Sequence, residues 1–333
     1  MQNFDATSRA QLTASAANEP PPLEQVRPGL WAVGLPFGTG HVPYTLSYLL
    51  EDARGGLHVV DPGPPSEANW QTLTEAMAAT GHRFTDVRSI LVTHVHFDHL
   101  GLADRLAGAT GAPVLMHALD RTALQHARDG RPRRLLEQNV VRWGVPEMRR
   151  AEIVASIRDP HPLDDGVSNI DLVGSEQLDV PGRRVRVLHT PGHTPGHVAF
   201  HLEDEKILFT GDHVLPTVFP AVGLGGPAER NPLREYLDSL ALVRAFQGHE
   251  VLPGHGYRFT GLAERCRAIE AHQRRRAGEA AQLTRSHPEW SVWQIAAHLH
   301  WSRNWDDFSG SLLRNALTQT SIYADFSERI QNN

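Results

Sequence analysis

The chain has 333 residues, of which 40% are apolar and 21% charged, with a formal net charge of −6 and a single cysteine. These values are typical of a globular protein and exclude an internal disulfide and a general attraction to nucleic acid. No run of about 18 apolar residues exists, so we expect no membrane-spanning helix, and the cysteine usage favours a reducing cytoplasm.

The N-terminal segment lacks the basic start and apolar core of a secretion signal, and we expect residues 1–25 to form a flexible or loosely docked arm. Hydrophobic patterning then predicts elements that alternate along the chain. Strands are expected over 29–34, 45–50, 57–61, 87–93 and 113–116, and an amphipathic helix over 65–79. This order favours an α/β fold.

Potential metal ligands are concentrated directly after the strand expected over residues 87–93. They are His94, His96, Asp98 and His99. Imidazole nitrogen and carboxylate oxygen are ligands that zinc, iron and manganese accept, and α/β proteins tend to place their chemistry at strand ends. A surface cluster is the alternative, because the chain has 20 histidines. The dense spacing after an apolar strand favours a metal site.

The same pattern of apolar run, Gly or Pro turn and potential ligand occurs three more times, far along the chain. It places His193, Asp212 and His255 at the ends of these runs. Together the four segments supply seven potential ligands. That number suits two metals that share one carboxylate, as in two-metal hydrolases.

These motifs resemble the metallo-β-lactamase superfamily, in particular its glyoxalase II-like hydrolases, over roughly residues 26 to 260. The resemblance implies an αββα sandwich, in which two sheets pack face to face with helices outside and the metals at the edge. It assigns His94, His96 and His193 to one metal, Asp98, His99 and His255 to the other, and Asp212 to both. It also implies that Asp61 supports the site and that His189, His197 and His213 do not bind metal.

Two segments within the expected domain of residues 26–261 are candidates for substrate binding. Residues 118–158 are predicted to be a helical insertion with nine arginines, including Arg133 and Arg134. They form either an exposed amphipathic hairpin or a lid whose arginines receive an anionic group. The loop over residues 215–226 is apolar, and its Phe219 either lines an acyl-binding wall or only covers the core.

The C-terminal region, residues 262–333, is expected to be helical, with helices to residue 285, over 292–299 and over 309–329. Four of the seven tryptophans lie within 16 residues, at positions 290, 293, 301 and 305. The region is similar to the winged-helix-like tails of some lactamase-fold hydrolases. It has no basic strip beyond residues 274–276, which disfavours nucleic acid as a partner and favours a structural or homodimer-forming role.

The function expected from this resemblance is hydrolysis of a small, anionic acyl compound, with a thioester first and a lactone or other ester second. Two divalent metals, zinc by default and iron or manganese as alternatives, would activate a bridging hydroxide, with Asp98 and Asp212 as the catalytic carboxylates. A nuclease of the same fold and a mono-iron persulfide dioxygenase are the alternatives. A Gly-x-Ser-x-Gly nucleophile elbow is absent.

Overall fold

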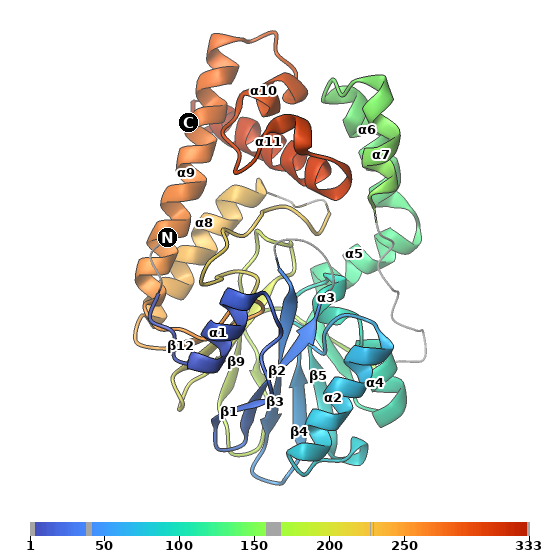
Figure 1. Ribbon diagram of the computed structural model, residues 1–333, viewed down its shortest axis with the longest axis vertical. Coiled ribbons are helices and arrows are strands. Elements are labelled where there is room, and N and C mark those ends of the chain that lie inside the picture. The colour runs from blue at the N-terminus through green and yellow to red at the C-terminus, as the bar shows by residue number, and fades with distance from the viewer. Residues whose placement is uncertain (1–3, 38–41, 158–167, 227, 229, 332–333) are drawn as a thin grey trace.

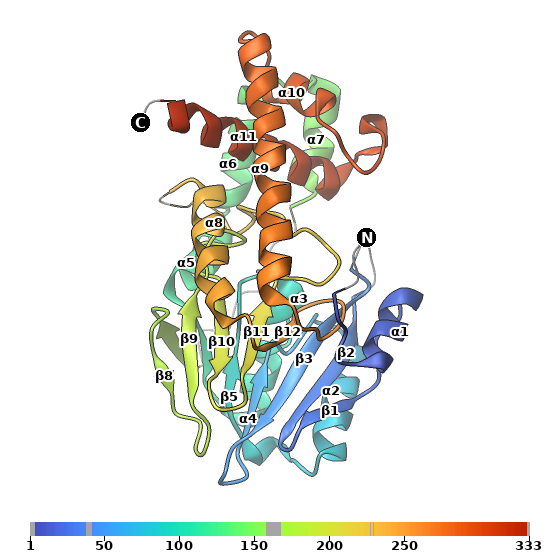
Figure 2. The same cartoon turned by 90° about the vertical axis from the view of Figure 1, so that its left-hand side faces the viewer.

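The computed structural model describes residues 4–37, 42–157, 168–226, 228 and 230–331. Two β-sheets pack face to face, and helices cover both outer faces (Figures 1 and 2). This architecture confirms the αββα sandwich expected from the sequence. Among the described residues, no helix combines the length and the apolar character needed to cross a membrane.

The first sheet has seven strands that lie side by side in chain order. The neighbours from β1 to β4 are antiparallel, whereas those from β4 to β7 are parallel. The strands are β1 (Glu24–Arg27), β2 (Leu30–Pro36), β3 (Tyr44–Glu51), β4 (Leu57–Val60), β5 (Val87–Leu91), β6 (Val114–His117) and β7 (Asn169–Leu172). The parallel strands carry their carboxyl ends to one edge of the sheet, where the predicted ligands follow β5.

The second sheet has five strands in the order β12-β11-β10-β9-β8. Only β11 and β12 are parallel. The strands are β8 (Gln177–Leu178), β9 (Val185–His189), β10 (Val198–Leu202), β11 (Ile207–Gly211) and β12 (Glu250–Pro253). Each strand expected from the sequence is present, and β1, β7, β8 and β10 occur in addition.

Side-chain alternation along the strands builds the two layers of core on either side of the first sheet. In β3, Tyr48 and Leu50 face the second sheet, where they belong to a cluster with Phe209, whereas Leu49 faces outward. On that outer face Leu73 of α2 belongs to the same cluster as Leu49. The covering helices are α2 (Glu67–Ala79), α3 (Phe97–Leu100) and α4 (Ala103–Thr110), with the short 3-10 turn η1 (Phe84–Asp86).

The N-terminal segment is more ordered than the arm expected over residues 1–25. Residues 9–17 form helix α1 (Arg9–Ala17), and Ser8 caps it by accepting a hydrogen bond from the backbone of Gln11. Ser8 and Gln11 are buried, and both donate to Glu24 on β1. Polar contacts hold this helix on the sandwich together with a single apolar contact through Leu12, which is why hydrophobic periodicity did not predict it.

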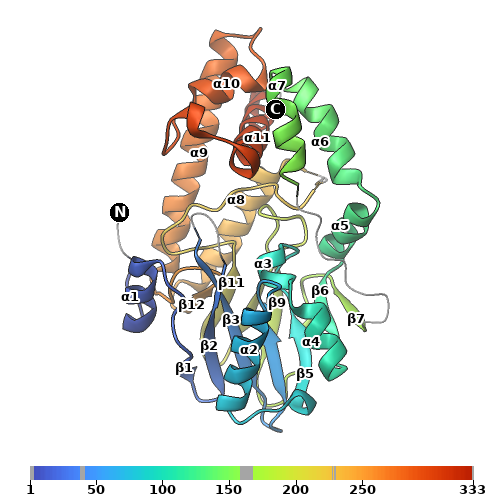
Figure 3. The same cartoon turned by 45° about the vertical axis from the view of Figure 1, so that its right-hand side comes forward.

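The insertion and the C-terminal region form one helical layer at one end of the sandwich (Figure 3). The remaining helices are α5 (Ala118–Arg128), α6 (Arg131–Arg142), α7 (Glu147–Ala155), α8 (Pro232–Val243), α9 (Leu262–Ser286), α10 (Val292–His298) and α11 (Gly310–Gln331), with η2 (Arg244–Phe246) and η3 (Trp305–Asp307). Trp143 after α6 and Ile153 of α7 share a core with Leu317 of α11. Trp293 donates its backbone N–H to the Trp143 carbonyl at 2.9 Å. Helices α6 and α7 therefore pack against the C-terminal region, and Arg158 lies outside the described residues.

We predict that Leu317→Ala lowers the free energy of unfolding by about 2–5 kcal/mol, because Leu317 is fully buried where α11 meets α6 and α7. Urea denaturation followed by circular dichroism measures this change. The control is Met148→Ala on α7, since Met148 is 86% exposed and its loss is expected to change stability by less than about 0.5 kcal/mol. Equal effects of the two substitutions would contradict a shared core.

Candidate metal centre

The ends of three strands, one helix and one turn position the predicted ligands at one edge of the sandwich. His94 and His96 follow β5, Asp212 follows β11 and His255 follows β12. Asp98 and His99 lie on α3, which begins directly after His96. His193 comes from the turn between β9 and β10, so all seven predicted ligands reach the same region from both sheets.

The first donor group consists of His94, His96, His193 and Asp212, whose ligand atoms lie within 4.8 Å of one another. The Nδ1 atom of His96 is 3.0 Å from Nε2 of His94 and 3.1 Å from Nε2 of His193. Asp212 Oδ2 is 3.7 Å from that His193 nitrogen. Three nitrogens and one oxygen thus converge, which is the donor set of a tetrahedral zinc site.

The second donor group consists of Asp98, His99 and His255. The Nε2 atoms of the two histidines are 3.3 Å apart, and Asp98 Oδ2 is 3.3 Å from that of His255. Asp212 also reaches this group, because its Oδ1 lies 3.4 Å from His99 Nε2 and 3.3 Å from His255 Nε2. The two oxygens of Asp212 therefore face different donor groups, as a bridging carboxylate requires.

The buried carboxylates and imidazoles of the site shift one another's pKa values. Burial opposes the charged form of every group, but the Asp212 and Asp98 carboxylates raise the pKa of His255 to about 10 and that of His99 well above its ordinary value. Burial likewise opposes ionisation of Asp98, yet His99 and His255 lower its pKa to about 2. Within the described residues no Lys or Arg pairs with Asp98 or Asp212. The described residues therefore offer these two buried carboxylates positive charge only on protonated imidazoles.

Two further observations indicate that the donor set suits divalent cations. Asp212 Oδ1 is buried and accepts no hydrogen bond from any described residue. The imidazole nitrogens that point away from the centre are held by oxygen atoms: His255 Nδ1 lies 2.6 Å from the Tyr44 carbonyl and His193 Nδ1 lies 2.7 Å from the Ala221 carbonyl. A proton on each outer nitrogen leaves a lone pair on the inner one, ready for a metal.

Asp61 supports the site from the end of β4, as the resemblance implied. Its Oδ2 is 2.8 Å from His99 Nδ1, and it accepts hydrogen bonds from the backbone N–H and the hydroxyl of Thr93 at 2.8 and 2.7 Å. The backbone of Asp61 has a φ of +49°, a left-handed conformation that is uncommon for residues other than glycine. The three side-chain contacts stabilise this backbone conformation. Through them Asp61 orients both His99 and the end of β5.

Asp120, at the start of α5, is a supporting residue that the sequence analysis missed. Its fully buried carboxylate accepts hydrogen bonds from Val95 N–H at 2.8 Å, Gly196 N–H at 2.6 Å and the Thr194 hydroxyl at 2.8 Å. Burial raises its pKa to about 6, although these three donors favour the ionised form. Asp120 therefore ties the loop of His94 and His96 to the turn of His193. Its position just after β6, at the same edge as the ligands, is the signal that could have found it.

Close backbone approach explains two glycines in the ligand loops. A Cβ atom on Gly254 would lie 2.5 Å from His99 and 2.7 Å from Asp212 Oδ1. Gly211 has a φ of +46°, and a Cβ there would lie 2.6 Å from the Thr93 hydroxyl. Any larger residue at these positions would displace a donor or its support.

Three neighbouring histidines lie outside both donor groups, as expected from the resemblance. His197 is buried with Nδ1 at 2.8 Å from the Thr190 hydroxyl. His189 Nε2 lies 2.8 Å from the Pro195 carbonyl, and its ring stacks on His117. His213 is fully buried beside the Tyr236 ring, and burial lowers its pKa to about 3. These side chains pack and orient the turns around the ligands.

The structure does not bring the three predicted substrate residues together. Arg133 and Arg134 are exposed on α6, and neither lines the cavity found beside His255. Phe219 stacks on His272 of α9 with ring centroids 4.0 Å apart, directly after Val218, which does line that cavity. A substrate role for these residues remains a prediction.

Comparison with known proteins identifies relatives that match about two thirds of this chain. The family model described as the metallo-beta-lactamase superfamily matches residues 42–255. An uncharacterized protein of Mycobacterium tuberculosis is 30% identical over 214 residues, which cover 62% of this chain and 83% of that protein. An atrochrysone carboxyl ACP thioesterase of Aspergillus fumigatus is 27% identical over 232 residues, 69% of this chain and 57% of that protein.

Solved structures extend the likeness beyond the sandwich. A metallo-beta-lactamase family protein from Thermus thermophilus has a TM-score of 0.75 at 28% identity, covering 92% of this chain and 95% of its own. A beta-lactamase domain protein from Burkholderia ambifaria has a TM-score of 0.77 at 24% identity, covering 97% and 92%, and this likeness concerns the fold alone. Because these matches cover more than nine tenths of this chain, they include the helical layer as well as the sandwich.

We predict that Asp120→Ala weakens metal affinity by about 10- to 100-fold, because it frees both ligand loops from a shared anchor. Competition with a chromophoric chelator measures the affinity. Asp120→Asn keeps one acceptor oxygen and is expected to recover part of the loss. Asp129→Ala, an exposed substitution at the other end of α5, is the matched control. Unchanged affinity in folded Asp120→Ala would show that the residue does not position the ligands.

Proposed function

This chain belongs to the metallo-beta-lactamase superfamily, and we propose that it is a dinuclear, metal-dependent hydrolase of small acyl compounds within the glyoxalase II-like branch. Thioesters are the first substrate class and lactones or other esters the second. Zinc is the default metal from the ligand type, with iron and manganese as alternatives. The observation that carries the proposal is Asp212, whose two oxygens face two complete donor groups.

Two divalent cations, when bound, would lower the pKa of a water from about 16 to near neutral and polarise a carbonyl oxygen. The chain's own residues then have defined tasks. Asp98, with its pKa at about 2, stays ionised at neutral pH and orients the nucleophilic water by accepting its hydrogen bond. In the hydrolysis the water oxygen bonds to the acyl carbon, the carbon–sulfur bond breaks, and the departing thiolate takes up a proton. The products are a carboxylate and a thiol.

Covalent catalysis by a thiol is disfavoured by the position of the single cysteine. Cys266 lies within α9 and is 1% exposed. Burial raises the pKa of its thiol to about 12, so the reactive thiolate is scarce at neutral pH. The nucleophile is therefore best supplied by water at the donor groups.

Support for a thioester substrate comes from the relative that is named as a carrier-protein thioesterase. The chain spans 57% of that relative, so the likeness supports the class of reaction more than a particular substrate. A mono-iron dioxygenase would use the first donor group alone. The second group, completed by His255 and Asp212, is the observation that favours two metals.

We predict that Asp212→Ala loses both metals, because both donor groups share this carboxylate. The kcat is expected to fall on the order of 10³-fold, which corresponds to a loss of about 4 kcal/mol of transition-state stabilisation. Elemental analysis and turnover of an acyl thioester measure the two effects. The matched control is Asp204→Ala, since Asp204 is exposed and pairs with Arg184 away from the ligands. Full metal content in Asp212→Ala would contradict the bridging role.

The substrate class is tested by offering the metal-reconstituted protein an acyl thioester, a lactone and a phosphodiester. We expect the thioester to be hydrolysed with the highest kcat/KM and the phosphodiester to be the poorest substrate. Turnover confined to the phosphodiester would replace this proposal with the nuclease alternative.

A further inference from the structure

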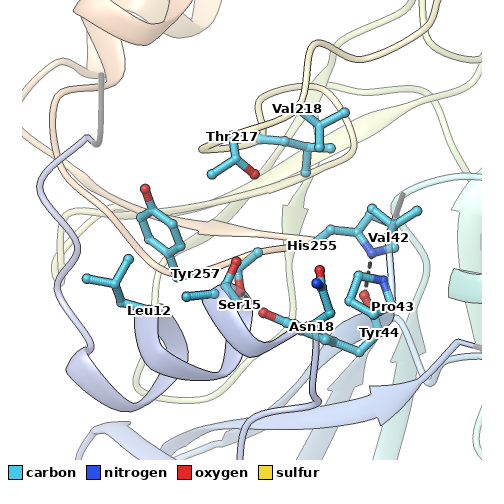
Figure 4. A pocket seen from close by; sticks show the side chains of 13 residues that line it. Leu12, Ser15, Asn18, Val42, Pro43, Tyr44, Thr217, Val218, His255 and Tyr257 are labelled. Carbon is cyan, nitrogen blue, oxygen red and sulfur yellow. Dashed lines mark hydrogen bonds between the residues drawn. The ribbon is translucent and has the colours of Figure 1, made fainter. Parts of the chain in front are cut away.

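A cavity of about 270 Å³ lies beside the second donor group and includes His255 in its wall (Figure 4). The loop that leads into β3 and the loop after Asp212 supply the rest of the inner wall, through Val42 and Pro43 on one side and Leu215 and Val218 on the other. The volume is slightly below the range of about 300–1,000 Å³ that ligand sites occupy. The cavity therefore accepts a small group next to His255.

Helix α1 closes the cavity on its outer side. Leu12 and Ala16 line it together with Ser15, so the N-terminal segment contributes directly to the space beside the donor group (Figure 4). The helix is fixed there through the segment that carries His255. The Gln11 amide oxygen accepts a hydrogen bond from the Arg258 backbone N–H at 2.9 Å, and the buried Arg258 guanidinium reaches Glu24 at 2.9 Å.

The lining has a distinctive chemistry. Among the described residues, the lining contains no Lys, Arg, Asp or Glu, and its polar side chains other than His255 are uncharged. Tyr257 is 1% exposed, and its hydroxyl has no hydrogen-bond partner among the described residues. In Figure 4 the Tyr257 ring lies next to Leu12.

We propose that this cavity binds the acyl chain of the substrate, and that the chain is uncharged, mainly apolar and carries a hydroxyl or keto oxygen that pairs with Tyr257. The proposal rests on the proposed hydrolysis of acyl thioesters. Helix α1 then acts as the wall that limits the length of the acyl chain.

The size and charge of the cavity decide which half of a thioester it receives. Thiols of the glutathione or coenzyme A type are large and carry charges, whereas the described residues of the lining offer no charged partner except His255. An apolar acyl chain gains from burial against Leu12, Leu215 and Val218, while the thiol half is left outside the cavity.

The test uses the metal-loaded full chain and measures the affinity of octanoate and acetate by titration calorimetry, independently of turnover. Octanoate is expected to bind at least about ten-fold more tightly, because several methylenes are buried. Ala16→Phe places a ring in the cavity and is expected to remove this preference. Thr13→Phe adds the same ring on α1 at an exposed position outside the lining and is expected to preserve it.

Val218→Phe fills the cavity from the opposite wall and replaces Ala16→Phe if that variant does not fold. A wild-type protein without chain-length preference, or a preference that survives in both filled variants, would overturn the proposal. Octanoate preference without hydrolysis of any acyl thioester would instead overturn only the proposed function.

Tyr257→Phe tests the polar contact with a series of hydroxyoctanoates that differ in the position of the hydroxyl. One isomer is expected to bind wild-type protein more tightly than octanoate does, and to lose about 3- to 10-fold in the variant, while octanoate is unaffected. Equal losses for octanoate and every isomer would show that Tyr257 acts through packing alone.

Discussion

The structure depends on two carboxylates, Asp98 and Asp212, that are buried without a lysine or arginine partner among the described residues. An unpaired buried charge is costly, so such groups persist only where cations or protonated imidazoles compensate them. Parallel strand ends from both sheets bring the imidazoles to this point. Asp61 and Asp120 then fix the loops, and the glycines at 211 and 254 let the backbone approach closely enough.

The ligands could be predicted from the sequence because their signal is local. Each follows an apolar run that reads as a strand, and the strands are long enough and regular enough to be recognised by composition. The structure brings all seven residues together. The sandwich was predictable for the same reason, through the resemblance that these motifs carry. The short strands β7 and β8 were not, since β7 is mostly exposed and β8 has two residues, so neither has an apolar pattern.

Features that depend on polar contacts leave no local pattern in the sequence by which they could be predicted. The only fully buried side chain of helix α1 is the polar Gln11, and one of its partners, Arg258, lies 247 residues away in the sequence. Asp120 bonds mainly to backbone groups, which are the same in every sequence. The amphipathic faces of α6 and α11 could be recognised, but periodicity alone does not say that they pack against each other. The insertion was therefore expected to be either an exposed amphipathic hairpin or a lid.

The central claim is that one carboxylate joins two metal sites. A crystal structure of zinc-loaded protein, with anomalous data collected at the zinc edge, tests it most directly. We predict two anomalous peaks about 3.5–4 Å apart, one beside each oxygen of Asp212. A single peak among His94, His96 and His193, with the second donor group still paired through protonated His255, would contradict the account.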